Sequence, residues 1–264
     1  SGAVTTFAGP PAGTTTSGST DNATASNARF SYPIGLTTDN GTNLYVSEAN
    51  NNKIRKIVIS SGAVTTFAGP PAGTTTSGDT DNATASNARF YMPYGITTDG
   101  TNLYVSDSSN NKIRKIVISS GEVTTLAGPP AGTTTSGSTD NATASNARFN
   151  RPAGIVTDGT NLYVADWGNQ VFQVFDENNK FLYMNRGEAD LNQWALEYFE
   201  SQQDEKRARS SYVPVFKTDT EDVREISARI EPYFWDPCSI MVDEEGRVYV
   251  LETCRHRFQI FERI

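Results

Sequence analysis

Short segments with alternating apolar and polar residues recur along this chain. Residues 52–60, NKIRKIVIS, alternate in this way, and such alternation predicts a β-strand with one buried face. Residues 33–39, PIGLTTD, are joined through an Asn-Gly turn to residues 43–48, NLYVSE, which is the pattern of a β-hairpin. Residues 63–69, AVTTFAG, predict a shorter fourth strand. The pattern therefore predicts units of four antiparallel strands.

The same unit is copied along the chain. Residues 1–60 recur almost unchanged at 61–119, a third copy begins at residue 120, and a diverged fourth lies near the C-terminus. The shared positions are Phe30, Pro33, Tyr45, Glu48; Phe90, Pro93, Tyr104, Asp107; Phe149, Pro152, Tyr163, Asp166; and Phe234, Pro237, Tyr249, Glu252. Repeated four-stranded units are typical of β-propellers. We predict one all-β domain over residues 1–264, with four four-stranded antiparallel blades.

The third strand of each unit resembles a known repeat. Residues 254–261, CRHRFQIF, are similar to the Asn-His-Arg-Ile-Gln-Val-Phe strand of NHL repeats, and residues 52–57 and 111–116, both NKIRKI, resemble a bacterial variant of it. The resemblance covers most of the chain and implies an NHL-repeat β-propeller. NHL propellers usually have six blades, whereas four Tyr-Val strands are found here.

The two ends of the chain complement each other. Val4, Thr5, Thr6 and Phe7 match an outermost strand with no inner strands before it, and residues 256–262 match a third strand with no fourth after it. Because an exposed strand edge invites pairing, we expect residues 3–8 to pair with residues 256–262. Pairing within one molecule, the simpler alternative, gives a four-bladed ring. Pairing between two copies gives a homodimer that shares an eight-bladed ring.

Residues 188–232 interrupt the repeat between the third and fourth blades. Leu191, Trp194, Tyr198 and Phe199 fall on one face of a predicted helix, and a second short helix fits residues 218–230. We therefore predict a small helical insertion. It either packs on the side of the propeller or serves as a docking element.

Charge is distributed unevenly along the chain. Nine basic and nine acidic residues lie in residues 1–150, and the remaining 13 basic and 21 acidic residues account for the net charge of −8. A fusion of two related propellers, an engineered protein, or a recent duplication beside an older blade would each give this shift. The net charge, with Lys53, Arg55 and Lys56 on an outer strand, argues against a nucleic-acid partner.

Composition adds three further expectations. No apolar run approaches the roughly 18 residues of a transmembrane helix, so we expect no membrane partner. Two cysteines are too few for a disulfide framework. The Ser/Thr-rich, Cys-poor first half slightly favours a bacterial secreted or surface protein, although the localisation stays open.

The predicted inner strands offer little chemistry. Residues 33–39, 93–99, 152–158 and 237–243 would line the central channel, and their alternating positions contain no His and no interior acid. We therefore expect no catalytic residues, no cofactor and no metal site. The acids that follow each Tyr-Val strand are expected to make a structural hydrogen bond in every blade. The favoured function is a non-catalytic binding or assembly scaffold; the alternative is a secreted NHL-type enzyme or sensor domain that lacks its catalytic or signalling partner segment.

The residues that differ between copies indicate where a partner would bind. They lie before the inner strand and after the Tyr-Val strand, so we expect both sets at one end of the propeller. Aromatic residues, Met and Arg are enriched there, as in protein interfaces. The candidate interaction face comprises Tyr32, Met92, Tyr94, Arg151, Trp167, Trp235 and Arg255, and its partner would be an unknown protein or small ligand.

Overall fold

Each copy of the repeat forms one antiparallel sheet in a computed structural model, which describes residues 2–139, 146–176, 178–187, 234–254 and 256–262. The four sheets are arranged as a four-blade β-propeller. Blades 1 and 2 consist of β1 (Pro33–Thr38), β2 (Asn43–Glu48), β3 (Lys53–Val58), β4 (Val64–Ala68), β5 (Pro93–Thr98), β6 (Asn102–Asp107), β7 (Lys112–Val117) and β8 (Val123–Ala127). Blades 3 and 4 consist of β9 (Pro152–Thr157), β10 (Leu162–Asp166), β11 (Val171–Phe175), β12 (Phe181–Asn185), β13 (Pro237–Val242), β14 (Val248–Glu252) and β15 (Arg257–Phe261).

Short 3₁₀ turns connect the sheets and their strands. They are η1 (Ala25–Asn27), η2 (Ala85–Asn87), η3 (Ser108–Asn110) and η5 (Trp167–Asn169). The predicted insertion at 188–232 lies outside the described residues. Within the described part of the chain, no helix is both long and apolar enough to cross a membrane.

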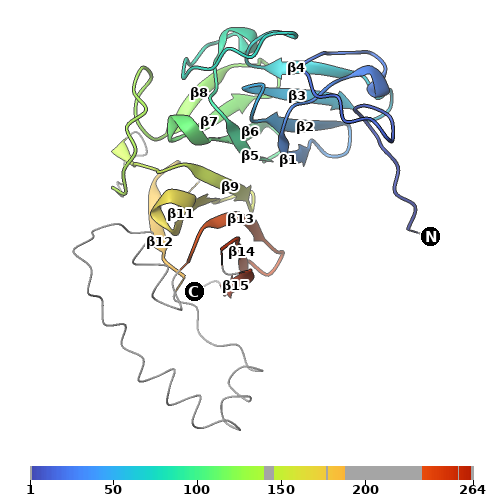
Figure 1. Ribbon diagram of the computed structural model, residues 1–264. Helices are drawn as coiled ribbons and strands as arrows, with labels where there is room; N and C mark the ends of the chain where they lie inside the picture. Colours follow the sequence, from blue (N-terminus) through green and yellow to red (C-terminus); the bar gives the residue numbers. More distant parts are fainter. Residues whose placement is uncertain (1, 140–145, 177, 188–233, 255, 263–264) are drawn as a thin grey trace.

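The inner strands of successive blades lie side by side. β1 packs on β5, β5 on β9 and β9 on β13, while β4, β8 and β12 lie on the outside (Figure 1). A Cβ atom at Gly95 would come within 2.4 Å of the Ala153 carbonyl oxygen in the next blade. A Cβ atom at Gly35 or Gly154 would come within 2.7 Å of Tyr94 or Ser239 in the following blade. Glycine in the inner strand thus permits the close approach of neighbouring blades.

The hydrophobic core lies between the blades. Tyr45 and Ile54 of blade 1 pack in one buried cluster with Phe90 and Ile96 of blade 2. The same positions meet again between blades 2 and 3 and between blades 3 and 4. We call the face of a blade that packs on the following blade its trailing face; in blade 1 this face contains Tyr45 and Ile54. We call the face that packs on the preceding blade its leading face; in blade 2 this face contains Phe90 and Ile96. Most of the apolar surface is therefore buried between neighbouring blades, while on the leading face of blade 1 the entering segment, with Ala28 and Phe30, covers Val46, Ile57 and Val64.

The acid after each Tyr-Val strand holds the loop that enters the same blade. The side chains of Glu48, Asp107, Asp166 and Glu252 accept hydrogen bonds of 2.7–2.9 Å from the backbone N–H groups of Ser31, Tyr91, Asn150 and Trp235. The predicted per-blade structural hydrogen bond is confirmed.

The partner of this buried acid changes along the chain. In blade 2, Arg114 forms ion pairs with Asp107 at 2.8 Å and with Asp81 at 2.6 Å, and the Arg114 and Asp107 side chains are fully buried. In blade 3, Gln173 donates an amide N–H to the acid instead, and in blade 4 Gln259 does the same while Arg257 also forms an ion pair with Glu252 at 2.7 Å. Burial raises the pKa of Asp107, and the neighbouring Arg114 guanidinium counteracts this rise.

Another acid closes the hairpin between the first two strands of each blade. In blade 2, Asp99 accepts hydrogen bonds from the backbone of Asn102 and from the hydroxyl group of Tyr104, at 2.6 and 2.8 Å. Asp158 bonds the Tyr163 hydroxyl at 2.9 Å in the same way. These acids are turn residues, as expected. Burial of each tyrosine, with the carboxylate at its hydroxyl, raises the pKa of Tyr104 and Tyr163 to about 12.

Stability should therefore fall in alkaline solution. An unfolded tyrosine ionises near its ordinary pKa of 10, whereas Tyr104 and Tyr163 keep their protons in the folded chain up to about pH 12. Their contribution is present below pH 10 and is lost as the pH rises towards 12. We expect the melting temperature to fall across this window, and absorbance at about 295 nm to show a late-titrating tyrosine class. Asp99→Asn should lower the pKa of Tyr104, because it removes the carboxylate at the hydroxyl group, but burial should still hold this pKa above 10. Ionisation of all 11 tyrosines together near pH 10 in the folded chain would refute this account.

The expected closure within one molecule is not formed in this structure, so that prediction is corrected. Residues 2–7 form no strand, Val4 is 96% exposed, and β13, β14 and β15 make a three-stranded sheet. No contact comparable to those between successive inner strands joins β13 to β1. The physical reason is the shape of the array. Four blades at these inter-blade angles form an open arc, and the N-terminal segment leads away from β15 (Figure 1).

Candidate functional site

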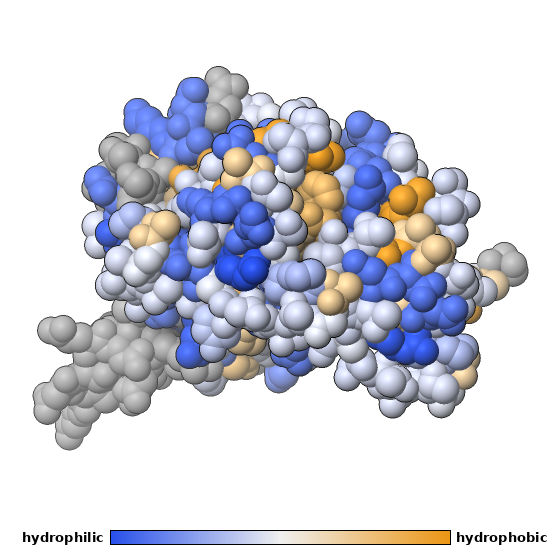
Figure 2. Space-filling view, turned by 90° about the horizontal axis from the view of Figure 1, so that it is seen from above, coloured by the Kyte–Doolittle hydropathy of each residue, from blue (hydrophilic) through white to orange (hydrophobic). Residues whose placement is uncertain are grey.

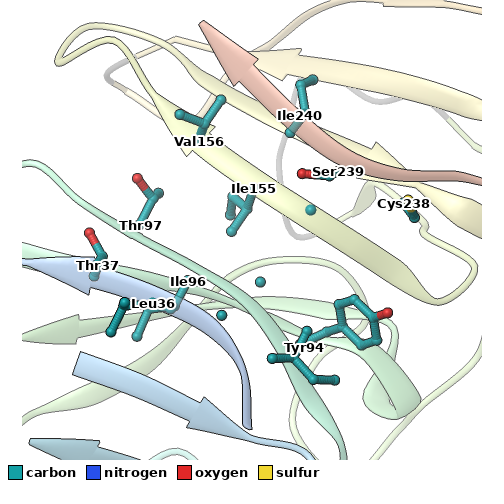
Figure 3. Close-up of a pocket in the computed structure, with 14 residues that line it drawn as sticks. Leu36, Thr37, Tyr94, Ile96, Thr97, Ile155, Val156, Cys238, Ser239 and Ile240 are labelled. Carbon is teal, nitrogen blue, oxygen red and sulfur yellow. The ribbon is translucent and has the colours of Figure 1, made fainter. Parts of the chain in front are cut away.

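The concave side of the arc forms a channel-like pocket. Its volume is about 480 Å³, and residues from all four inner strands line it. Figure 3 shows Thr37, Thr97 and Val156 near one end, and Tyr94 and Cys238 near the other. None of the 14 residues that line this pocket is His, Asp or Glu. Burial raises the pKa of the Cys238 thiol and of the Tyr94 hydroxyl, so both are protonated at neutral pH. Its lining therefore offers neither a general base nor carboxylate or imidazole ligands for a metal ion.

A second pocket lies at the loop end of blades 2, 3 and 4. Its volume is about 500 Å³, and the loops before the inner strands and after the Tyr-Val strands both contribute to it. The lining residues are Tyr91, Met92, Tyr94, Ser108, Ser109, Arg151, Ala153, Trp167, Cys238 and Thr253. We call this site the loop pocket.

Backbone geometry and cross-blade hydrogen bonds position the loop pocket. Met92 and Arg151 have φ values of +52° and +56°, so each loop bends sharply just before its inner strand. The Met92 N–H donates to the Asn52 side chain at 2.9 Å, and the Arg151 N–H donates to the Asn111 side chain at 2.8 Å. Each acceptor belongs to the preceding blade. The loops are thus held by neighbouring blades rather than by their own sequence alone.

The loop pocket combines aromatic surface with one positive charge. The Arg151 guanidinium lies 5.7 Å from the centre of the Trp167 ring, a cation–π arrangement. Hydroxyl groups come from Ser108 and Ser109, and no carboxylate lines the pocket. Such a surface can pack an aromatic or aliphatic group while the guanidinium pairs with a carboxylate or a carbonyl oxygen.

Four residues of the predicted interaction face meet in this one pocket: Met92, Tyr94, Arg151 and Trp167. Tyr32 occupies the equivalent loop of blade 1 and is 59% exposed, outside the lining. Trp235 occupies the equivalent loop of blade 4, where it is partly buried. Arg255 lies outside the described residues.

Several lining residues were absent from the predicted face. They are Tyr91, Ser108, Ser109, Ala153, Cys238 and Thr253. A signal for them is present in the sequence. Tyr91, Ser108 and Ser109 lie in the variable loops before the inner strand and after the Tyr-Val strand, and Thr253 follows Glu252 as Trp167 follows Asp166. Ala153 and Cys238 occupy the same position after the inner-strand proline as Tyr94. Aligning equivalent positions of the repeat, rather than selecting residues by type, would have identified them.

Comparison with known proteins agrees with this architecture. No family model matches the chain. It is 33% identical over 175 residues to a curated relative, and the match covers 61% of this chain and 23% of the relative. Together, the four-blade fold and the sequence similarity are consistent with an NHL-repeat β-propeller. The relative is NHL repeat-containing protein 2 of Homo sapiens, and the chain spans about a quarter of its length.

Solved structures share the fold at low sequence identity. An auxiliary nutrient binding protein from Bacteroides ovatus aligns with a TM-score of 0.53 and 11% identity, covering 89% of this chain and 50% of that one. Streptogramin B lyase aligns with a TM-score of 0.44 and 12% identity, covering 88% and 55%. The first comparison supports the propeller fold alone, and the second carries no argument about chemistry.

Proposed function

We propose that this chain is a non-catalytic binding module and that the loop pocket is its recognition site. The observation that carries the proposal is the convergence of Met92, Tyr94, Arg151 and Trp167 on one preformed pocket. Tyr, Trp, Met and Arg are enriched at protein interfaces, and Trp, Tyr and Arg dominate binding hot spots. Loops held by a rigid scaffold are common positions for binding residues.

The lining favours a peptide partner of defined chemistry. Trp167 and Tyr91 offer flat apolar surface, and the Arg151 guanidinium offers the one positive charge among the lining residues. A segment with an acidic residue beside an aromatic or aliphatic one would satisfy both. The chemistry of the two pockets supports a binding role over an enzymatic one, because neither lining pairs a nucleophile with a general base.

A displayed random peptide library tests this proposal. Peptides selected on the wild-type chain should contain an acidic residue next to an apolar one, and their affinity is measured by calorimetry. Arg151→Ala and Trp167→Ala should each weaken binding at least tenfold, which corresponds to about 1.4 kcal/mol.

Lys115→Ala provides the matched control. Lys115 is a partly exposed cation in a separate hollow with Asp99 and Thr160, beside the hairpin turns at the opposite end of the inner strands. Its loss should leave peptide affinity unchanged. If the selected peptides bound Arg151→Ala and Trp167→Ala as tightly as the wild type, the proposal would be wrong.

A further inference from the structure

The two end blades expose apolar positions that the inner blades bury. On the leading face of blade 1, Leu36 is 60% exposed, whereas its equivalents Ile96 and Ile155 are each 6% exposed. On the trailing face of blade 4, Phe258 is 63% exposed, whereas its equivalent Ile54 is fully buried. Met241, Leu251 and Ile260 are also exposed on blade 4. Figure 2 shows that hydrophobic surface is gathered in patches among hydrophilic residues on the side it presents.

These two faces are the complementary halves of one recurring junction. At the first internal junction, Ile54 on the trailing face of blade 1 packs in the same cluster as Ile96 on the leading face of blade 2. Phe258 stands at the position of Ile54, and Leu36 stands at the position of Ile96. The trailing face of blade 4 therefore fits the leading face of blade 1, although within one chain they do not meet.

The N-terminal segment independently indicates the same placement. The Gly69 N–H donates to the Ala85 carbonyl at 3.0 Å where β4 leaves blade 1 and the chain enters blade 2. The Gly9 N–H donates to the Ala25 carbonyl at 3.0 Å in the same way. Residues 4–8 thus stand where the fourth strand of a blade preceding blade 1 would lie. Among the described residues, the sheet of blade 4 has three strands, and no fourth strand pairs with β15.

We propose that two copies of this 264-residue chain associate head to tail, so that each supplies the fourth strand of the other's blade 4. Two arcs of four blades then close a symmetric eight-bladed ring. Propellers typically have four to eight blades, so two copies fit this range and three would exceed it. By the pairing of β3 with β4, the expected register places Phe258 opposite Ala8, Ile260 opposite Thr5 and Phe261 opposite Val4 of the partner copy.

One residue makes this junction differ from the internal ones. Ser239 of blade 4 stands at the position of Gly35, Gly95 and Gly154. A Cβ atom there would approach the next inner strand too closely at the internal spacing. The inner strands at the junction between copies must therefore stand slightly farther apart. Ser239→Gly should tighten the association.

The mass in solution and paired face variants test the association. Light scattering should give twice 28.7 kDa for the wild-type chain. Leu36→Asp and Phe258→Asp should each give the monomer mass with the melting transition retained, because both side chains are exposed in the single chain. Leu182→Asp, at a leucine 45% exposed on the outer strand of blade 3, is the matched control and should stay dimeric. If either aspartate variant fails to fold, the serine substitution at the same position replaces it.

Mixing the two variants distinguishes this junction from other dimers. Leu36→Asp keeps an intact trailing face and Phe258→Asp an intact leading face, so the mixture can form one good junction and should yield a heterodimer. A face that pairs with itself would not be rescued by mixing. A wild-type monomer at all concentrations, dimeric single variants, no rescue on mixing, or a mass that grows without limit would each overturn the proposal.

Discussion

Replacing Arg114 by alanine should lower the free energy of unfolding by about 3–5 kcal/mol, because it leaves a buried acid without its cation. The Arg114 side chain is fully buried and lies 2.8 Å from Asp107, which is also fully buried. It also donates to the backbone carbonyls of Arg89 and Thr80 and lies over the Phe90 ring. Urea unfolding of the variant and the wild type measures the loss.

Arg114→Gln is the informative comparison, because a glutamine occupies the equivalent position in blade 3. There, Gln173 donates to the Asp166 carboxylate at 2.9 Å, and the buried acid keeps a partner without an ion pair. The glutamine variant should therefore lose clearly less stability than the alanine variant. Equal losses in both variants would show that the space filled by arginine, rather than its bond to Asp107, stabilises blade 2.

Gly95→Ala should destabilise the chain by about 3 kcal/mol, the upper range for an overpacked site. The added Cβ atom would lie 2.4 Å from the Ala153 carbonyl oxygen and 3.0 Å from the Ile155 backbone nitrogen, and neither backbone atom can rotate away. The variant must therefore separate β5 from β9. Thermal unfolding measures the effect.

Ser239→Ala is the control for this substitution. Ser239 holds the equivalent position in β13, where its side chain is exposed in the single chain. Its replacement should leave the melting temperature of the monomer unchanged. If Gly95→Ala were equally silent, the close packing of inner strands would not limit stability.

Much of the fold could be predicted from the repeat itself. The pairing of apolar alternation with an Asn-Gly or Asp-Gly turn predicts strands and hairpins locally, and copying such a unit predicts blades. The recurrence of Glu48 and Asp107 also predicted a structural role, because a ligand site would not be needed in every blade.

The arrangement of the ends could not be predicted in the same way. A repeat pattern describes contacts between neighbouring copies, and the outer faces of blades 1 and 4 have no such neighbour within the arc. Whether residues 4–7 reach β15 depends on the angles between successive blades. Many small packing differences set these angles, so no single sequence motif determines them.

The candidate site was predictable in location but not in extent. Alignment of the copies placed the variable loops at one end, and four of the predicted residues line the loop pocket. Tyr32 and Trp235 occupy equivalent loops, yet the arc sets them outside its lining. Cys238 lines the pocket because it follows the inner-strand proline, a position whose side chain faces this end of the propeller.

Hydrogen–deuterium exchange with and without a selected peptide tests the central claim that the loop pocket is a recognition site. The account predicts that bound peptide slows exchange in residues 91–94, 108–111, 150–153 and 167–170. Exchange in the hairpin turns at the opposite end, around Asp99 and Asp158, should not change. Protection confined to those turns or to the outer strands, with the loop segments unaffected, would contradict it.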